Sequence, residues 1–135
     1  MAVKVSKEIQ DFLRGKAGWV ATAALDGTPN VSIKGSLRVL DDEHLAFADI
    51  NSLKTRKNLE ENPKVAVMVY DSEARKAYMF KGKVEIFSEG PLFDQMAQGL
   101  KQHMPNLPAP KYAVKVTVTA IFDQSGGPGG GRQIA

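Results

Sequence analysis

The sequence contains no cysteine in its 135 residues. Disulfides, iron–sulfur clusters, thiolate metal sites and thiol catalysis are therefore excluded, and any redox role requires a bound cofactor. Long apolar runs are also missing, because charges interrupt the N-terminal segment at Lys4, Lys7, Glu8, Asp11 and Arg14. Since neither a signal peptide nor a membrane span fits this pattern, we expect a soluble, cytoplasmic protein with no membrane partner.

Recognisable catalytic and metal-binding motifs are absent as well. There is no nucleophile elbow, no P-loop and no dinucleotide-binding glycine motif followed by a helix. The two histidines, His44 and His103, have no second metal ligand at a familiar spacing. A solvated turn explains the first, and a helix C-terminus explains the second. The sequence thus predicts no catalytic residue and no metal site.

The positive charge of the chain is modest and spread out. The formal net charge is +3, and the Lys and Arg residues form no block. RNA-binding sheets expose stacking aromatic residues, whereas Tyr78, Phe80, Tyr112 and Phe122 fall on the apolar faces of their segments. We therefore expect no nucleic-acid partner, and a nucleic-acid-binding barrel is an alternative that only the basic pI favours.

Length and composition indicate one folded domain with a short tail. Hydrophobic residues make up 43% of the chain and charged residues 24%, as in ordinary globular proteins. Residues 1–123 are predicted to form the domain, and the glycine-rich residues 124–135 a flexible tail, because they have too little apolar surface to fold alone. The tail is expected either to fold over a ligand or a neighbouring subunit, or to have no role.

Hydrophobic periodicity predicts a mainly β fold with short helices. We expect helices at 6–14, 53–61 and 92–104, and six strands at 19–25, 30–40, 45–49, 65–70, 77–87 and 112–122. The Asp26-Gly27 pair indicates a two-residue hairpin turn, so that the first three strands form a meander. The strand at 65–70 is apolar on both faces and is expected to be buried. These elements favour a six-stranded antiparallel split β-barrel, although an OB-like barrel also fits the count.

The helix at 53–61 carries its charges against its own dipole. Ser52 is a suitable N-cap, yet Lys54 and Arg56 lie at the positive end and Glu61 near the negative end. A bound anion would reverse this effect, since free backbone N–H groups, a lysine, a threonine hydroxyl and an arginine suit a phosphate monoester. The alternative is a solvated surface helix with unoptimised charges.

Two further segments are expected to border the same site. Residues 30–36 are unusually small and polar for the centre of a strand, which indicates either close approach of a ligand or an ordinary edge strand. Residues 48–51 end the next strand immediately before the helix cap, so their backbone is expected to line the same opening. Together with the helix start, these segments form a candidate anion-binding site.

This arrangement resembles the FMN-binding split barrels of the pyridoxamine 5'-phosphate oxidase-like superfamily, in its branch of small flavin-binding proteins, over residues 17–122. The pattern Ser-x-Lys-x-x-x-Asn-Leu-x-x-Asn-Pro-x-Val is supplied by Ser52, Lys54, Asn58, Leu59, Asn62, Pro63 and Val65. The resemblance implies an FMN cofactor and a homodimer with two FMN sites at its interface. It places Ser32, Ile33, Lys34, Ala48 and Asp49 toward the isoalloxazine ring and ribityl chain, and Ser52, Lys54 and Thr55 toward the phosphate.

Two apolar surfaces are expected to meet the second subunit of this homodimer. One is the apolar face of the helix at 92–104, and the other is the strand face that carries Met79 and Phe87.

The resemblance does not extend to the substrate site of the oxidase. True pyridoxamine phosphate oxidases carry a C-terminal Trp and an Arg-Leu-x-Pro ending, whereas the single tryptophan here is Trp19. Leu53 also stands where relatives often have an arginine. The resemblance therefore implies an FMN-dependent oxidoreductase or electron carrier with an unidentified small-molecule or protein redox partner. A haem-binding barrel that uses His44 or His103, and a deazaflavin in place of FMN, are alternatives.

Overall fold

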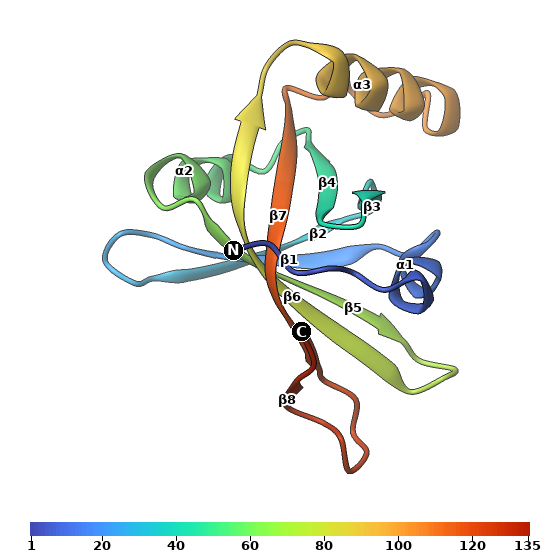
Figure 1. Ribbon diagram of the computed structural model, residues 1–135. Helices are drawn as coiled ribbons and strands as arrows, with labels where there is room; N and C mark the ends of the chain where they lie inside the picture. The colour runs from blue at the N-terminus through green and yellow to red at the C-terminus, as the bar shows by residue number, and fades with distance from the viewer.

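The computed structural model describes residues 1–135 and shows one twisted antiparallel sheet with three short helices around it (Figure 1). The strands are β1 (Gly18–Ala23), β2 (Pro29–Lys34), β3 (Arg38–Asp41), β4 (His44–Asp49), β5 (Lys64–Asp71), β6 (Lys76–Phe87), β7 (Tyr112–Asp123) and β8 (Arg132–Gln133). The helices are α1 (Lys7–Leu13), α2 (Leu53–Glu61) and α3 (Pro91–His103).

The strand order shows why the barrel is split. Neighbouring strands follow the path β2-β1-β5-β6-β7-β4-β3, and β8 pairs with β7 off this path. The two end strands, β2 and β3, do not pair with each other, so the sheet curls without closing. The predicted mainly β, antiparallel split barrel is therefore confirmed, with eight strands in place of six.

Residues 30–40, predicted as one strand, form two strands at opposite ends of the sheet. β2 pairs with β1, whereas β3 pairs with β4. The chain crosses between them at residues 35–37, where Ser36 Oγ accepts the amide N–H of Ala48 at 2.8 Å and Leu37 is buried in the core. The predicted three-strand meander is thus wrong, because these small and apolar residues anchor a crossing instead of continuing a strand.

The turn between β1 and β2 is longer than the predicted two residues. Ala24 N donates to Thr28 O at 2.9 Å, and Gly27 N donates to Ala24 O at 2.9 Å. The loop therefore holds three residues, 25–27. Gly27 has φ of 90°, the left-handed conformation that this loop type requires and that glycine adopts without steric cost.

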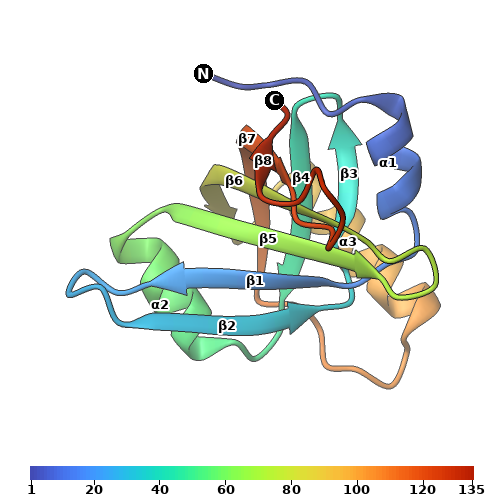
Figure 2. The same ribbon diagram turned by 90° about the horizontal axis from the view of Figure 1, so that it is seen from below.

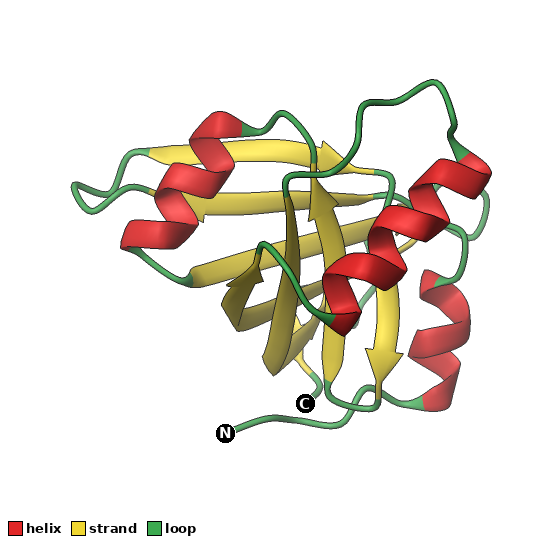
Figure 3. Cartoon of the chain, turned by 90° about the horizontal axis from the view of Figure 1, so that it is seen from above, coloured by secondary structure: helices red, strands yellow, loops and turns green.

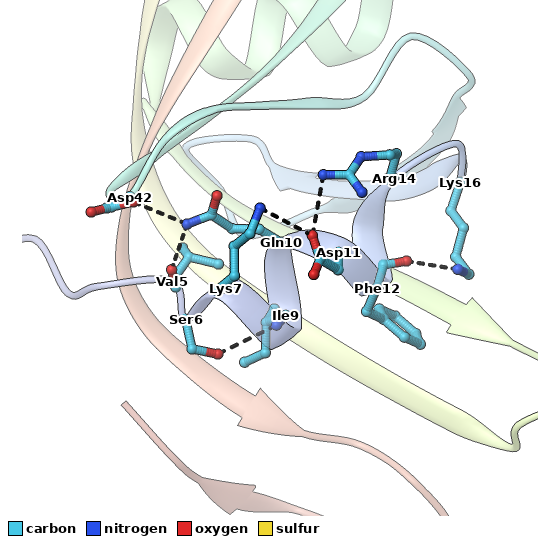
Figure 4. Close-up of polar contacts among 10 residues, drawn as sticks. All are labelled: Val5, Ser6, Lys7, Ile9, Gln10, Asp11, Phe12, Arg14, Lys16 and Asp42. Atoms are coloured by element: carbon cyan, nitrogen blue, oxygen red, sulfur yellow. Dashed lines mark hydrogen bonds and ion pairs between the residues drawn. The ribbon is translucent and has the colours of Figure 1, made fainter.

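Helix α1 follows the N-cap Ser6, as predicted, and is fixed to the β3–β4 turn (Figure 4). Ser6 Oγ accepts the amide N–H of Ile9 at 3.3 Å, as an N-cap does. Gln10 Nε2 donates to Val5 O at 2.8 Å and to Asp42 Oδ1 at 3.1 Å. These contacts hold the buried side of α1 against the open edge near β3.

The concave face of the sheet encloses the main core, and the helices cover different parts of the sheet. Phe47, Phe80 and Leu45 are fully buried in a cluster of 18 side chains. Figures 2 and 3 show α2 lying across β1 and β2, and α3 lying against β4 and β7. Under α3, Met96 and Leu100 pack on small alanine side chains in a second cluster. No helix is long and apolar enough to cross a membrane.

Strand β5 is central in the sheet, but it is buried on one face only. Val65, Val67 and Val69 point into the core, whereas Met68 is 39% exposed and Tyr70 is 49% exposed. The expectation of a strand buried on both faces is therefore wrong for the single chain. The outer face of this central strand is therefore an exposed surface with apolar side chains.

The C-terminal residues 124–135 turn back along β7. Gly131 N donates to Asp123 O at 2.6 Å, and Ile134 N donates to Ile121 O at 2.8 Å. Strand β8 pairs with the end of β7 through these residues. A contact of this segment with a ligand or a second subunit stays a prediction, as does its mobility.

Candidate functional site

A cavity of about 320 Å³ lies where β2, the β4–α2 loop and α3 meet. Its polar wall carries Lys34, Ser36 and Ser52, and its apolar wall carries Leu100 and Met104. Cavities of this size and mixed lining are typical of small-molecule sites. We call it the Lys34 cavity.

Asp49 and Lys34 fix the loop that leads into α2. Asp49 Oδ1 accepts the backbone N–H of Ser52 at 2.9 Å, and Lys34 Nζ donates to Ser52 Oγ. The hydroxyl of Ser52 makes no capping bond to α2. Ser52 therefore precedes the helix as predicted, but the expected side-chain cap is wrong, because Lys34 occupies the hydroxyl.

Lys34 is a buried lysine with no carboxylate in contact. It is 6% exposed and takes part in no ion pair. Its Nζ lies 5.9 Å from the centroid of the Phe47 ring. Burial lowers the pKa of Lys34 below its ordinary value, and the nearby carboxylate of Asp49 offsets this only in part. A cation held in this way favours a bound anion.

The first turn of α2 presents free backbone donors beside Lys34. Leu53 N donates to Asn51 O at 3.1 Å, whereas the amide N–H groups of Lys54 and Thr55 have no acceptor in the chain. These groups form the positive end of the helix dipole. The cavity wall therefore carries a lysine and a serine hydroxyl, and the N-terminus of α2 follows Ser52 directly in the chain. Together these groups form a donor set that suits a phosphate.

The hydroxyl of Thr55 is used within the fold. Thr55 Oγ1 lies 2.9 Å from Ser32 Oγ and accepts from Asn30 Nδ2 at 3.2 Å. Two predicted site residues, Ser32 and Thr55, are thus brought together between β2 and α2. Their shared hydrogen bond positions the first turn of the helix.

Two asparagines of the sequence motif dock the rest of α2 on the sheet. Asn58 Nδ2 donates to Thr22 Oγ1 at 3.0 Å, and Asn62 Nδ2 donates to the carbonyl of Ala23 at 3.2 Å. The face of α2 that meets β1 and β2 is therefore largely polar, with Leu59 as its fully buried apolar residue. The Asn-Leu-x-x-Asn pattern is therefore explained by these contacts, which dock α2 on the sheet.

Lys54 lies apart from the Lys34 cavity. Its side chain lines a second cavity of about 370 Å³ together with Lys57, between α2 and the β1–β2 loop. The structure thus gathers Ile33, Lys34, Ala48 and Ser52 around the first cavity and places Asp49 directly behind it. The predicted role of the Lys54 side chain in phosphate binding stays a prediction.

Sequence reasoning missed the part of the site that α3 supplies. Leu100, Met104 and Leu107 line the Lys34 cavity, although they follow β4 by some fifty positions in the chain. A signal was present: Met104 and Leu107 lie in or beside a run of prolines at 105–110, where exposed apolar residues indicate a ligand or contact surface.

Neither histidine lines the Lys34 cavity. His44 Nδ1 lies 2.7 Å from Asp41 Oδ1 at the β3–β4 turn. His103 is exposed at the end of α3. No three His, Asp or Glu side chains gather into a set that could hold a metal ion. The donors of the cavity are therefore cationic and hydroxylic rather than metal-ligating.

The chain belongs to the pyridoxamine 5'-phosphate oxidase family, whose model matches residues 5–125. The uncharacterized protein MJ0282 of Methanocaldococcus jannaschii is 36% identical over 135 residues, which span 98% of this chain and 89% of the relative. HupZ of Group A Streptococcus is a solved structure with 28% identity and a TM-score of 0.82, and the match covers 94% of this chain and 99% of HupZ.

Three further solved structures share the fold. An F420 reductase is 26% identical with a TM-score of 0.69, over 87% of this chain and 98% of the reductase. An FMN-binding protein from Syntrophomonas wolfei is 20% identical with a TM-score of 0.69, over 88% and 83% of the two chains. The haem storage protein HutZ from Vibrio cholerae is 20% identical with a TM-score of 0.68, over 92% and 98%. The fold thus occurs in flavin-binding and haem-binding proteins.

Proposed function

We propose that this protein binds FMN in the Lys34 cavity and acts as an oxidoreductase or electron carrier. The donors in and next to the cavity carry the proposal: a buried lysine bonded to a serine hydroxyl on the wall, followed in the chain by two free amides in the first turn of α2. This set suits the phosphate that distinguishes FMN from an uncharged ligand. Bound FMN would supply the redox chemistry, and the protein would supply position and electrostatics.

The residues present fit FMN in their chemistry. Lys34 and Ser52, with the amides of Lys54 and Thr55, would hold the phosphate. Apolar and small residues on the rest of the wall, such as Ala48, would contact the ring system. Leu100 and Met104 make one side of the cavity apolar, and apolar surroundings strengthen a charge interaction relative to water.

A row of apolar side chains supports the further proposal that the protein is a homodimer. The strand register pairs Ile33 with Trp19, Trp19 with Met68, Met68 with Met79, and Met79 with Phe122 across five neighbouring strands. Ile33 is 60% exposed, Trp19 is 42% exposed and Met68 is 39% exposed. A contiguous apolar surface of this kind is uncommon on a monomer.

We assign this row to a second copy of the chain because it is continuous with the cavity. Ile33 belongs both to the row and to the wall of the Lys34 cavity. A partner packed on the row would therefore cover the open side of the cavity. Of the surfaces predicted from the sequence, Met79 belongs to this row, whereas Phe87 and the apolar side of α3 pack on each other within the chain.

Haem is the second candidate ligand, because the haem storage protein HutZ has the same fold. A histidine axial ligand would have to reach the cavity, and neither His44 nor His103 lines it. Met104, which is on the wall, offers a thioether ligand only. The donor set thus favours a phosphate-bearing flavin over haem.

Optical titration of the purified protein tests these alternatives directly. We expect FMN to bind with a change in the visible flavin bands and with quenching of Trp19, whose ring lies on the row beside Ile33. Haemin and a deazaflavin, titrated in the same way, should bind more weakly. If the Soret band of bound haemin saturates at a lower haemin concentration than the concentration at which FMN saturates the flavin bands, the flavin assignment is overturned in favour of haem.

A further inference from the structure

Lys34 stands out among the ionisable residues because it is buried next to hydrogen-bond donors that have no anionic acceptor. Each of its neighbours on the cavity wall is uncharged, and its one hydrogen bond goes to a neutral hydroxyl, Ser52 Oγ. An isolated ammonium group in such surroundings is costly, and a protein relieves this cost either by losing the proton or by binding an anion.

We propose that Lys34 takes up a proton when the phosphate of FMN binds in the Lys34 cavity. This inference rests on the proposed function and adds a protonation step to it. The amine gains one proton from solvent and becomes an ammonium group, which donates to the phosphate oxygens. Binding and protonation then favour each other.

The charges around Lys34 support this coupling. From β4, Asp49 is the one carboxylate that acts on it, and that carboxylate already accepts the amide of Ser52. From α2, Ser52 stands at the N-terminus of the helix, so the ammonium group that bonds its hydroxyl lies near the positive end of the helix dipole, which opposes the ammonium form. From α3, the lining residues Leu100 and Met104 are apolar. Asp49 therefore compensates the ammonium charge only in part, and a phosphate in the cavity would supply further negative charge.

The pH dependence of binding follows from this arrangement. Burial holds the pKa of Lys34 below its ordinary value in the free protein, and a bound phosphate would raise it again. Between these two pKa values the free protein carries an amine and the complex an ammonium group. In that range the affinity for FMN should fall by up to about tenfold for each unit by which the pH rises.

Calorimetric titration with FMN measures the proton directly. The heat is recorded between about pH 7 and 10 in pairs of buffers with different ionisation enthalpies, since the ordinary pKa of lysine is about 10.4. Wild type should take up protons in the window between the pKa values of Lys34 in the free protein and in the complex, up to close to one proton per FMN, and none well below both values. Riboflavin, which lacks the phosphate, should produce no uptake.

Three variants isolate Lys34. Lys34→Arg keeps its charge at every pH, so it should bind FMN with no proton uptake and no decline at high pH. Lys34→Gln should bind about ten- to a hundredfold more weakly and without uptake. Lys57→Gln removes an exposed lysine of α2 that does not line the Lys34 cavity, and this variant should behave as wild type.

The outcomes separate this inference from the function on which it rests. Failure of wild type to bind FMN at any pH overturns both. FMN binding without proton uptake, uptake that persists in Lys34→Gln, or equal uptake with riboflavin overturns the inference and leaves the proposed function standing.

Discussion

Replacing Asn58 by alanine tests how α2 is held against the sheet. Asn58 is 2% exposed, and its Nδ2 donates to Thr22 Oγ1 at 3.0 Å. The substitution removes a buried hydrogen bond and leaves the Thr22 hydroxyl without a partner. We expect the free energy of unfolding to fall by about 1–3 kcal/mol, because an orphaned buried polar group costs this much.

Urea unfolding measures this loss. With a urea m-value of about 1–3 kcal/mol per molar, the midpoint should move down by roughly 1 M at an unchanged m-value. Lys57→Ala is the matched control on the same helix, since Lys57 is exposed and makes no ion pair or side-chain hydrogen bond. Its midpoint should stay close to that of wild type.

A double-mutant cycle distinguishes the hydrogen bond from a general packing loss. Thr22→Val combined with Asn58→Leu removes both polar groups, so the pair should recover part of the stability lost by either single change. FMN affinity should fall in Asn58→Ala, because α2 presents the amides at its N-terminus to the ligand. Additive single effects, or a loss below about 0.5 kcal/mol, would refute polar docking of α2.

Three other outcomes follow from the structure. Met68→Asp should raise the dimer dissociation constant at least tenfold in sedimentation experiments, whereas Lys83→Asp, exposed but outside the apolar row, should not; a wild-type monomer with FMN present would contradict the row assignment. Gly82→Ala should lower the free energy of unfolding by roughly 1–3 kcal/mol, since its Cβ would lie 2.4 Å from a β7 carbonyl oxygen, and Gly126→Ala, with open space around it, should not. Because the pKa of Lys34 is lower in the folded chain than in the unfolded chain, protonation favours unfolding, and the stability of the ligand-free protein should rise with pH through the window between the two pKa values. Lys34→Met should therefore be more stable than wild type at pH 7 without ligand and show no such rise.

The strand pattern of the sequence predicted the parts of the fold in which local and tertiary preferences agree. In β6, Tyr78, Phe80 and Val84 alternate with exposed residues, and the burial pattern follows this alternation. Helix α2 has the predicted bounds, Leu53–Glu61, because a serine before it and a proline after it limit it.

The hydrophobic pattern of residues 30–40 did not predict that this segment divides into two strands. Their composition is compatible with a continuous strand, yet β2 and β3 separate because Ser36 binds the amide of Ala48 and Leu37 enters the core. Both contacts join residues from distant strands. Local sequence carries no information about them, so the crossing was not predictable.

The candidate site shows the same division. The sequence pointed to the start of α2 through its inverted charges, and the structure puts a cavity there. The buried lysine on its wall is nevertheless Lys34 from β2, and the Lys54 side chain lines a separate cavity between α2 and the β1–β2 loop. Which lysine enters the cavity depends on the sheet register and on the hydrogen bond to Ser52, and neither is encoded within the helix segment.

Binding of FMN at the Lys34 cavity is tested most directly by a titration in which the cavity is filled from within. Gly35 lines the cavity, and a Cβ added there would meet only Met104 Cε, at 4.0 Å, so a large side chain is accommodated by the backbone but occupies the space of a ligand. We expect wild type to bind one FMN per protomer and Gly35→Trp to bind none. Glu8→Trp, at an exposed position of α1 that does not line this cavity, should bind as wild type does. Unchanged FMN binding by a folded Gly35→Trp variant would contradict the account.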